Sequence, residues 1–325
     1  MSRSFNRIDY SIRPAKYAER RMLRDVFRRL SAFEPCENYA YVGFGSVWFS
    51  DFSLFHRSLG VQQMLSIESS KAAEQRVRDN APFKISLAFD RSTKVLPTMS
   101  WEGRKFVWLD YDEALTPDML RDLRTCVMNV RSGSVISISV RCSAAKEADQ
   151  AAPEDDDEAV NALPIIERFR EKFANWHVPE EVGEDDLYGW PYADLINTMI
   201  ETEIEVALAV RNGPRAGPDF CSKKICTINY QDGAMMTTYV ALIFSEDERD
   251  KSDACNFDTL SFVESPTTPV HINVPKLTPR EFRLLEGQLP NAPQEALALG
   301  SIPLKEAAAF RQFYRYFPNF VVTEN

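Results

Sequence analysis

Residues 39–68 constrain the fold more than any other part of this chain. An apolar and aromatic run at 39–42 is followed by Gly43-Phe44-Gly45, then by a helix-like segment and by a second apolar run at 64–67 that ends on Glu68. The order strand, glycine turn, helix, strand and acid is typical of α/β folds, in which helices join parallel strands. This stretch therefore predicts the first βαβ unit of a parallel sheet.

The glycine turn has two interpretations. The first glycine allows a tight turn and the second allows the backbone to approach a ligand, as in nucleotide-binding loops. Trp48 stands where a dinucleotide fingerprint has its third glycine, so NAD or FAD fits this loop poorly. The alternative, held at equal weight, is a plain strand-to-helix turn that binds nothing.

Further strand and helix patterns alternate along the chain. The expected strands lie at 85–89, 105–109 and 134–140, and the expected helices at 50–58, 117–130, 162–175 and 191–211. Two β-rich runs at 224–230 and 235–244 then flank Asp232-Gly233, and Asp-Gly is a strong hairpin signal. The sequence therefore predicts a mainly parallel sheet followed by an antiparallel hairpin.

This layout resembles the class I S-adenosylmethionine-dependent methyltransferase superfamily over about residues 35–246. The resemblance implies a twisted, mostly parallel, seven-stranded Rossmann-like sheet whose last two strands form a hairpin. It further implies that Gly43 and Gly45 face the methionine part of S-adenosylmethionine, that Glu68 binds its ribose, that Asp90 lies near its adenine, and that Asp110 lies on the substrate side. The sequence departs from the family at the end of its first strand, which lacks the usual acid, and at 110–112, which lack an Asn/Asp-Pro-Pro-aromatic motif.

The acidic candidates also have structural interpretations. Glu68 could be a solvated strand end, although α/β ligands bind at the carboxyl edge where it lies. Asp110 and Asp112 flank Tyr111 and point the same way if the strand continues. They could orient a nucleophile, accept its proton or bind a cation, or Asp112 could cap the following helix. Asp110 is the stronger catalytic candidate.

Charge and composition limit the class of protein. The chain has 325 residues and a net charge of −10, so we expect a globular protein and little general affinity for nucleic acid. The first 30 residues are nevertheless basic, and 143–160 is an acidic insertion. Six scattered cysteines suggest neither a disulfide framework nor a metal site, and His177 and His271 lack Cys or His partners. A reducing cytoplasm is the expected location, with no membrane span.

Three segments are expected: a basic amphipathic helix within 1–34, the α/β domain at 35–246, and a connector with a small helical appendage at 247–325. On the first segment Arg13, Lys16, Arg20 and Arg24 recur at helical spacing. A solvated helix face is the preferred interpretation, and a grip on a phosphate or an acidic partner is the alternative. For the aromatic C-terminus, packing ranks above partner binding, and partner binding above base stacking.

The leading functional hypothesis is a methyltransferase that uses S-adenosylmethionine and an unidentified O or N acceptor. Its catalytic candidates are Asp110 and Asp112, and its cofactor-binding candidates are Gly43, Gly45, Glu68 and Asp90. The competing hypothesis is a catalytically silent methyltransferase-like subunit that engages a protein partner through its basic helix or aromatic tail. A nucleic-acid-modifying or nucleic-acid-sensing protein is a third, less favoured hypothesis.

Overall fold

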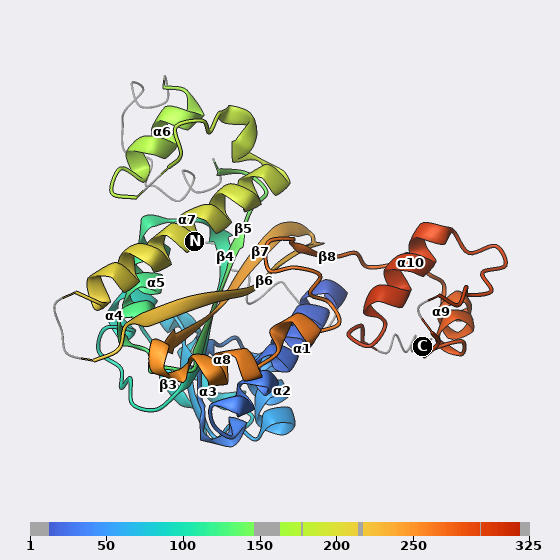
Figure 1. Ribbon diagram of the computed structural model, residues 1–325, viewed down its shortest axis with the longest axis horizontal. Helices are drawn as coiled ribbons and strands as arrows, with labels where there is room; N and C mark the ends of the chain where they lie inside the picture. The colour runs from blue at the N-terminus through green and yellow to red at the C-terminus, as the bar shows by residue number, and fades with distance from the viewer. Residues whose placement is uncertain (1–12, 146–162, 177, 214–216, 293, 319–325) are drawn as a thin grey trace.

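The computed structural model describes residues 13–145, 163–176, 178–213, 217–292 and 294–318. Its strands alternate with helices through the first half of the chain (Figure 1). The strands are β1 Ala40–Phe44, β2 Gln63–Ile67, β3 Ser86–Ala88, β4 Lys105–Ala114, β5 Ser134–Arg141, β6 Phe220–Asp232, β7 Ala234–Ser245 and β8 Val270–Ile272. The helices are α1 Pro14–Arg29, α2 Ser50–Leu59, α3 Glu74–Asp79, α4 Ser92–Val95, α5 Pro117–Asn129, α6 Ile165–Lys172, α7 Gly189–Arg211, α8 Arg249–Ala254, α9 Pro279–Glu286 and α10 Leu304–Phe313.

All eight strands form one sheet in the order β3-β2-β1-β4-β5-β7-β6-β8. Strands β1 to β5 pair in parallel, and β7 is antiparallel to both β5 and β6. The predicted α/β class, parallel sheet and hairpin are confirmed. The predicted count of seven strands is wrong by one, because the short strand β8 pairs in parallel with β6 and extends the edge of the sheet.

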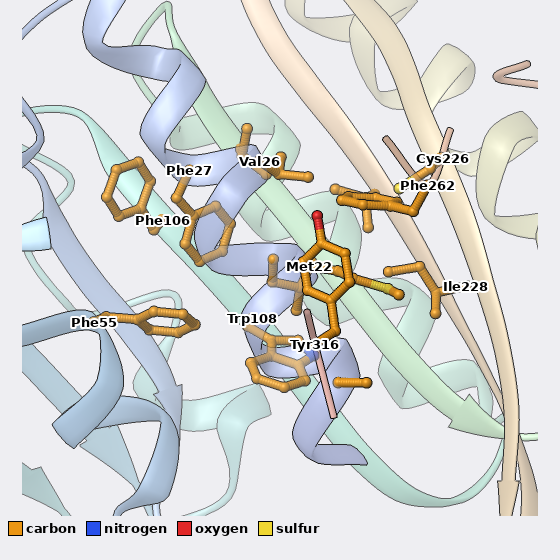
Figure 2. Packing of buried hydrophobic residues seen from close by; sticks show 14 of the residues in the cluster. Met22, Val26, Phe27, Phe55, Phe106, Trp108, Cys226, Ile228, Phe262 and Tyr316 are labelled. Carbon is orange, nitrogen blue, oxygen red and sulfur yellow. The ribbon is translucent and has the colours of Figure 1, made fainter. Parts of the chain in front are cut away.

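The first face of the sheet is covered by α1, α2 and α8. The apolar residues of α1 recur at helical spacing, so one stripe faces the sheet. Met22, Val26 and Phe27 on this stripe are fully buried, and Figure 2 shows them among aromatic side chains of the strands and α2. The ring of Phe27 stacks on Phe106 with their centroids 4.6 Å apart. This packing attaches α1 firmly to the centre of the sheet.

The second face is covered by α5 and α7, which also contact each other. The start of α5 is set by its sequence: Thr116 accepts a hydrogen bond from the Met119 N–H, and Pro117 occupies the first turn. Helix α7 buries apolar residues along most of its length, including Ile196, Ile200 and Ile204. The two faces therefore hold two apolar cores with the sheet between them.

The predicted solvated basic face of α1 is wrong for two of its residues. Lys16 is 3% exposed and Arg20 is 8% exposed. Their long side chains lie between the helix and the sheet, where the carboxylates of other elements meet them. Helical periodicity had placed these residues on one face, but it could not say that the face meets acidic groups.

The C-terminal residues pack more closely than a connector would. Within 247–268, which the sequence suggests is a polar connector, α8 forms and Phe257 and Phe262 are buried. Tyr316 packs edge-on against Phe262, with ring centroids 5.6 Å apart. Packing, the first-ranked role of the aromatic tail, is therefore confirmed for this ring. Helices α9 and α10 form the small appendage at the right of Figure 1.

The structure does not test two expectations, the acidic insertion and the division of the chain into three segments. Most of the acidic insertion at 143–160 lies outside the described residues, and the division into three segments stays a prediction. Within the described parts of the chain, none of the helices has the length and apolar character needed to cross a membrane.

Candidate functional site

Three neighbouring strands bring the predicted residues to one edge of the sheet. Gly43 of β1 is in register with Ser66 of β2 on one side and with Trp108 of β4 on the other. Registered residues share a face, and side chains two positions on return to it. Gly45, Glu68 and Asp110 therefore follow at the carboxyl ends of three adjacent parallel strands. The strand order reverses between β1 and β4, and ligands of α/β folds bind at such a point.

The glycine loop is packed against its own neighbours. A Cβ atom on Gly43 would lie 2.4 Å from the Tyr41 Oη, and one on Gly45 would lie 2.0 Å from the Ser66 Oγ. Both positions therefore require glycine for close approach of protein groups. Ser66 is 1% exposed, and its Oγ has no hydrogen-bond partner within the described residues. A buried hydroxyl without a partner beneath this loop marks it as a polar spot that something else could satisfy.

At the end of the glycine loop, the side chain of Trp48 is exposed to solvent and that of Phe49 lies in the core. Trp48 is 47% exposed, whereas Phe49 is fully buried and has a left-handed backbone with φ of +45°. A non-glycine residue in this region is strained, and such strain concentrates at functional sites. The sequence suggests that Trp48 crowds the loop, but its side chain faces solvent instead. The buried Phe49 fixes that orientation.

Glu68 is half-buried directly after β2. Its Oε1 accepts a hydrogen bond from the Ser70 N–H at 2.9 Å. Burial raises the pKa of Glu68, the amides of Ser70 and Ser69 act in the opposite direction, and the charge of Asp112 raises it further. The carboxylate is therefore anchored by backbone at the carboxyl edge, as a ribose-binding acid would need.

Asp90 follows β3 and lies at the surface. Its Oδ1 accepts a hydrogen bond from the Arg91 N–H at 2.8 Å and lies 3.5 Å from the Lys94 Nζ. The Arg91 amide is the main cause of a lowered pKa for Asp90. Like Glu68, Asp90 is held by groups that lie close to it in the sequence.

The end of β4 is irregular where the catalytic candidates lie. Asp110 pairs with Ser139 and Ala114 with Arg141, so the register shifts between them. Such bulges re-aim side chains, often beside active sites. The Asp110 side chain is 27% exposed, and Asp112 is exposed. Asp112 does not cap the following helix, because Thr116 does.

Tyr111 lies between Asp110 and Asp112 in the sequence and contacts both α5 and the glycine loop. Its hydroxyl donates to Asp122 Oδ2 of α5 at 2.7 Å. Its ring meets Phe44 of the glycine loop edge-on, with centroids 4.9 Å apart. Tyr111 thus connects the ends of β1 and β4 on the second face of the sheet, while Asp110 lies on the first.

Sequence reasoning missed the residues of α1 that reach this edge. Lys16 Nζ lies 2.5 Å from Asp110 Oδ1 and 2.8 Å from Glu19 Oε2. It also lies 4.4 Å from the centre of the Trp108 ring, within range of a cation–π interaction. The main-chain N–H of Lys16 donates to Asp232 Oδ2 at 2.9 Å. The available signal was Glu19, an acid among basic residues on the apolar side of the helix.

A second group of ionisable side chains, Tyr41, Asp51 and Arg20, lies beside the Lys16 ion pairs. The Tyr41 hydroxyl donates to Asp51 Oδ2 of α2. Burial raises the pKa of Asp51, and the charge of Arg20 from α1 opposes that rise. Asp51 lies in the first turn of α2 and also accepts this buried hydrogen bond.

The remaining titratable candidates have structural partners. His56 Nδ1 lies 2.8 Å from the Val61 carbonyl oxygen, and the His56 ring packs on Phe83. His56 therefore has a packing role. The six cysteines are unbridged, and no cluster of three or more His, Cys, Asp or Glu suited to a metal ion occurs in the described ranges.

A family model decides the classification. The model of the family described as "Putative O-methyltransferase" matches residues 8–325. The chain belongs to this family. Membership confirms the resemblance to methyltransferases drawn from the strand order and the strand-end residues, and it does not favour the catalytically silent alternative. No curated protein matches the chain.

Solved structures with related folds are distant. Trm1 from Pyrococcus horikoshii, in complex with S-adenosyl-L-methionine, is 12% identical, with 73% of this chain and 58% of that chain covered and a TM-score of 0.44. The O-methyltransferase TomG from Streptomyces achromogenes is 14% identical, with 74% and 94% covered and a TM-score of 0.33. DesVI from Streptomyces venezuelae is 17% identical, with 40% and 52% covered and a TM-score of 0.30. The chain thus spans about half the length of DesVI.

Proposed function

We propose that this protein transfers a methyl group from S-adenosylmethionine to a hydroxyl oxygen of an acceptor molecule. The observation that carries the proposal is the register of Gly43 with Ser66 and Trp108, which brings the glycine loop, Glu68 and Asp110 to one edge at the reversal of strand order. The family description favours oxygen as the acceptor atom.

The residues at this edge fit the proposed cofactor. The loop at Gly43 and Gly45 presents backbone without side chains, which suits close approach of the methionine part. Glu68 is anchored by the Ser70 amide and can accept hydrogen bonds from ribose hydroxyls. Asp90 would lie near the adenine, at the surface end of the site. The unsatisfied Ser66 Oγ supports a polar ligand over this loop.

In the proposed reaction the protein holds the acceptor and takes a proton from it. S-adenosylmethionine, when bound, supplies an electrophilic methyl group on a sulfonium. Asp110 would orient the acceptor hydroxyl and accept its proton. The exposed Asp112, whose charge acts on Glu68, would help to position the acceptor. Alignment of the two reacting groups supplies much of the rate in such a transfer.

The test is isothermal titration of the full chain with S-adenosylmethionine, S-adenosylhomocysteine and NAD. We expect micromolar binding of the first two and none of NAD, and we expect Glu68→Ala to weaken both at least tenfold. Glu102→Ala is the matched control, because Glu102 is exposed in the segment before β4, at the opposite edge of the sheet. If neither of the first two ligands binds, or if Glu68→Ala binds like Glu102→Ala, the proposal is wrong.

A further inference from the structure

The ions under α1 form one connected unit with three members. Lys16 lies between Glu19 and Asp110, at 2.8 Å and 2.5 Å from their nearest oxygens. The side chains of Lys16 and Glu19 are 4% and 0% exposed, whereas that of Asp110 is 27% exposed. Asp110 is therefore the member that a bound molecule can reach, and the other two lie behind it.

A chain of hydrogen bonds connects Trp108 to Glu19. The indole Nε1–H of Trp108 can only donate, and it donates to Ser139 Oγ at 2.8 Å. Thr238 donates its one hydroxyl proton to Glu19 Oε1, so across the 2.7 Å contact between Ser139 Oγ and Thr238 Oγ1 the Ser139 hydroxyl is the donor. The other Glu19 oxygen faces Lys16. Burial raises the pKa of Glu19, and the Lys16 ammonium and the Thr238 hydroxyl act in the opposite direction.

With Glu19 and Asp110 both ionised, one ammonium faces two carboxylates, so the unit has one more negative than positive charge. Asp110 is the member of the unit that is partly exposed. Among the other ionisable groups nearby, Arg20 acts on Asp51 and Arg13 acts on Asp232, whereas Glu68 and Asp112 are two further acids at the same end of the sheet. The hydroxyls of Tyr41 and Tyr230 also face this region, and burial raises the pKa of each well above its ordinary value, so both stay neutral. A buried excess charge is costly unless a cation or a proton compensates it.

We propose that Glu19, Lys16 and Asp110 act as a single proton acceptor in methyl transfer, with Asp110 as the catalytic residue and the two α1 residues as positioning residues. This inference rests on the proposed function. The geometry points to it because the excess negative charge lies at Asp110, two residues beyond the strand partner of Gly43. Helix α1 thereby becomes part of the catalytic machinery.

The charges balance through the step. The acceptor oxygen uses an electron pair to bond the methyl carbon, the carbon–sulfur pair remains on sulfur, and the O–H proton passes to Asp110. Before the step the unit's excess negative charge faces a sulfonium, and after it a protonated unit faces a neutral thioether. The three-residue unit and the cofactor sulfur together carry no net charge in either state. The transfer therefore leaves no uncompensated charge in a poorly solvated place.

This balance predicts how the free protein takes up protons with each ligand. S-adenosylmethionine brings its own positive charge, so its binding needs no proton. S-adenosylhomocysteine lacks that charge, so the unit takes up as much as one proton when water is displaced. Isothermal titration in two buffers of different ionisation enthalpy measures this proton number without any acceptor or turnover.

Three variants sharpen the test. In Asp110→Asn the excess charge is gone, so both ligands should bind with the same proton number. In Lys16→Met the free protein already holds a proton, so S-adenosylmethionine should release it on binding. Asp253→Asn is the control, because its partner Lys223 lies 3.3 Å away in an exposed pair and both residues lie beside the other edge of the sheet. It should behave like the wild type.

The outcomes separate the two proposals. Binding of both ligands with a difference in proton number that Asp110→Asn removes supports the inference. Equal proton numbers in the wild type, or a difference that persists in Asp110→Asn, would overturn the inference and leave the methyltransferase proposal standing. If neither ligand binds, the proposed function fails and the inference fails with it. Should Asp110→Asn not fold, the wild-type comparison and Lys16→Met still decide.

Discussion

Lys16 Nζ and Asp110 Oδ1 are 2.5 Å apart, although 94 residues separate them in the sequence. One residue comes from the first helix and the other from the end of the fourth strand. Their contact ties the N-terminal helix to the edge of the sheet where the glycine loop and Glu68 also end. The helix is thus a part of the candidate site, and changes in it should act on the site.

Removing the ammonium group of Lys16 should lower the free energy of unfolding more than removing the charge of the partly exposed Asp110. Lys16→Met leaves two carboxylates facing each other in a buried place, and we expect it to lower the free energy of unfolding by about 3 kcal/mol. Asp110→Asn should cost less, because 27% of its side chain is exposed and Lys16 keeps Glu19 as a partner. Urea unfolding measures both. Lys223→Met, in an exposed pair, should change stability by less than about 0.5 kcal/mol, and an equal loss in all three would contradict the burial argument.

The loop should tolerate no side chain at Gly45 while Ser66 keeps its hydroxyl. The Cβ of Gly45→Ala would lie 2.0 Å from Ser66 Oγ, and we expect a loss of about 1–3 kcal/mol in unfolding free energy. Adding Ser66→Ala removes the clashing atom and should recover part of the loss, leaving a 3.2 Å contact with the Ser66 Cβ. Gly183→Ala, whose new Cβ would meet nothing closer than 4.0 Å, is the control. A double variant no more stable than the single one would show that the clash is not the cause.

The stability of the protein should depend on pH through Asp51. Burial raises the pKa of Asp51 in the folded protein, opposed by Arg20 and by the Tyr41 hydroxyl. The folded state therefore favours the protonated acid, so this contribution to stability is complete below the unfolded pKa of about 3.9 and is lost as pH rises through the higher folded value. Asp51→Asn should remove that loss while still accepting from Tyr41.

The measurement is urea unfolding of wild type and Asp51→Asn between about pH 4 and pH 7. We expect the variant to gain stability relative to the wild type as pH rises. Asp253→Asn should show no such gain, because its side chain is 64% exposed. Parallel pH profiles for the wild type and Asp51→Asn would show that Asp51 titrates as an ordinary surface acid.

Trp48 should report on ligand binding without supporting the fold. Its side chain is 47% exposed and follows the glycine loop directly, so Trp48→Phe should change the free energy of unfolding by less than about 0.5 kcal/mol. If S-adenosylmethionine binds at this loop, the fluorescence change on titration should shrink in Trp48→Phe. It should persist in Trp101→Phe, since Trp101 precedes β4 at the other edge of the sheet. An undiminished change in Trp48→Phe would place the ligand elsewhere.

Much of the fold follows from local patterns. Alternating apolar runs and helical periodicity predicted the parallel strands and the helices that cover them, and Asp232-Gly233 predicted the hairpin. The sequence did not predict that β8 joins the sheet. A strand of three residues is too short for its pattern to indicate which strand it pairs with. The roles of Asp110, Asp112, Gly43, Gly45, Glu68 and Asp90 stay predictions, although their places at strand ends are now known.

The sequence by itself determined the order of the strands and helices, because turn residues and side-chain alternation are local properties of the chain. It did not determine every strand end: the fourth strand was expected at 105–109, and β4 continues to Ala114. Only the tertiary structure decided which charges meet. Lys16 and Asp110 are joined, and Glu19 lies against Thr238, 219 residues further on, because α1 packs against β6 and its side chains reach β4 and β7. The sequence of a helix shows which charges the helix carries, but not which charges of other elements will lie against them. The buried ion group, and with it the proposed proton acceptor, therefore appears only when the chain is folded.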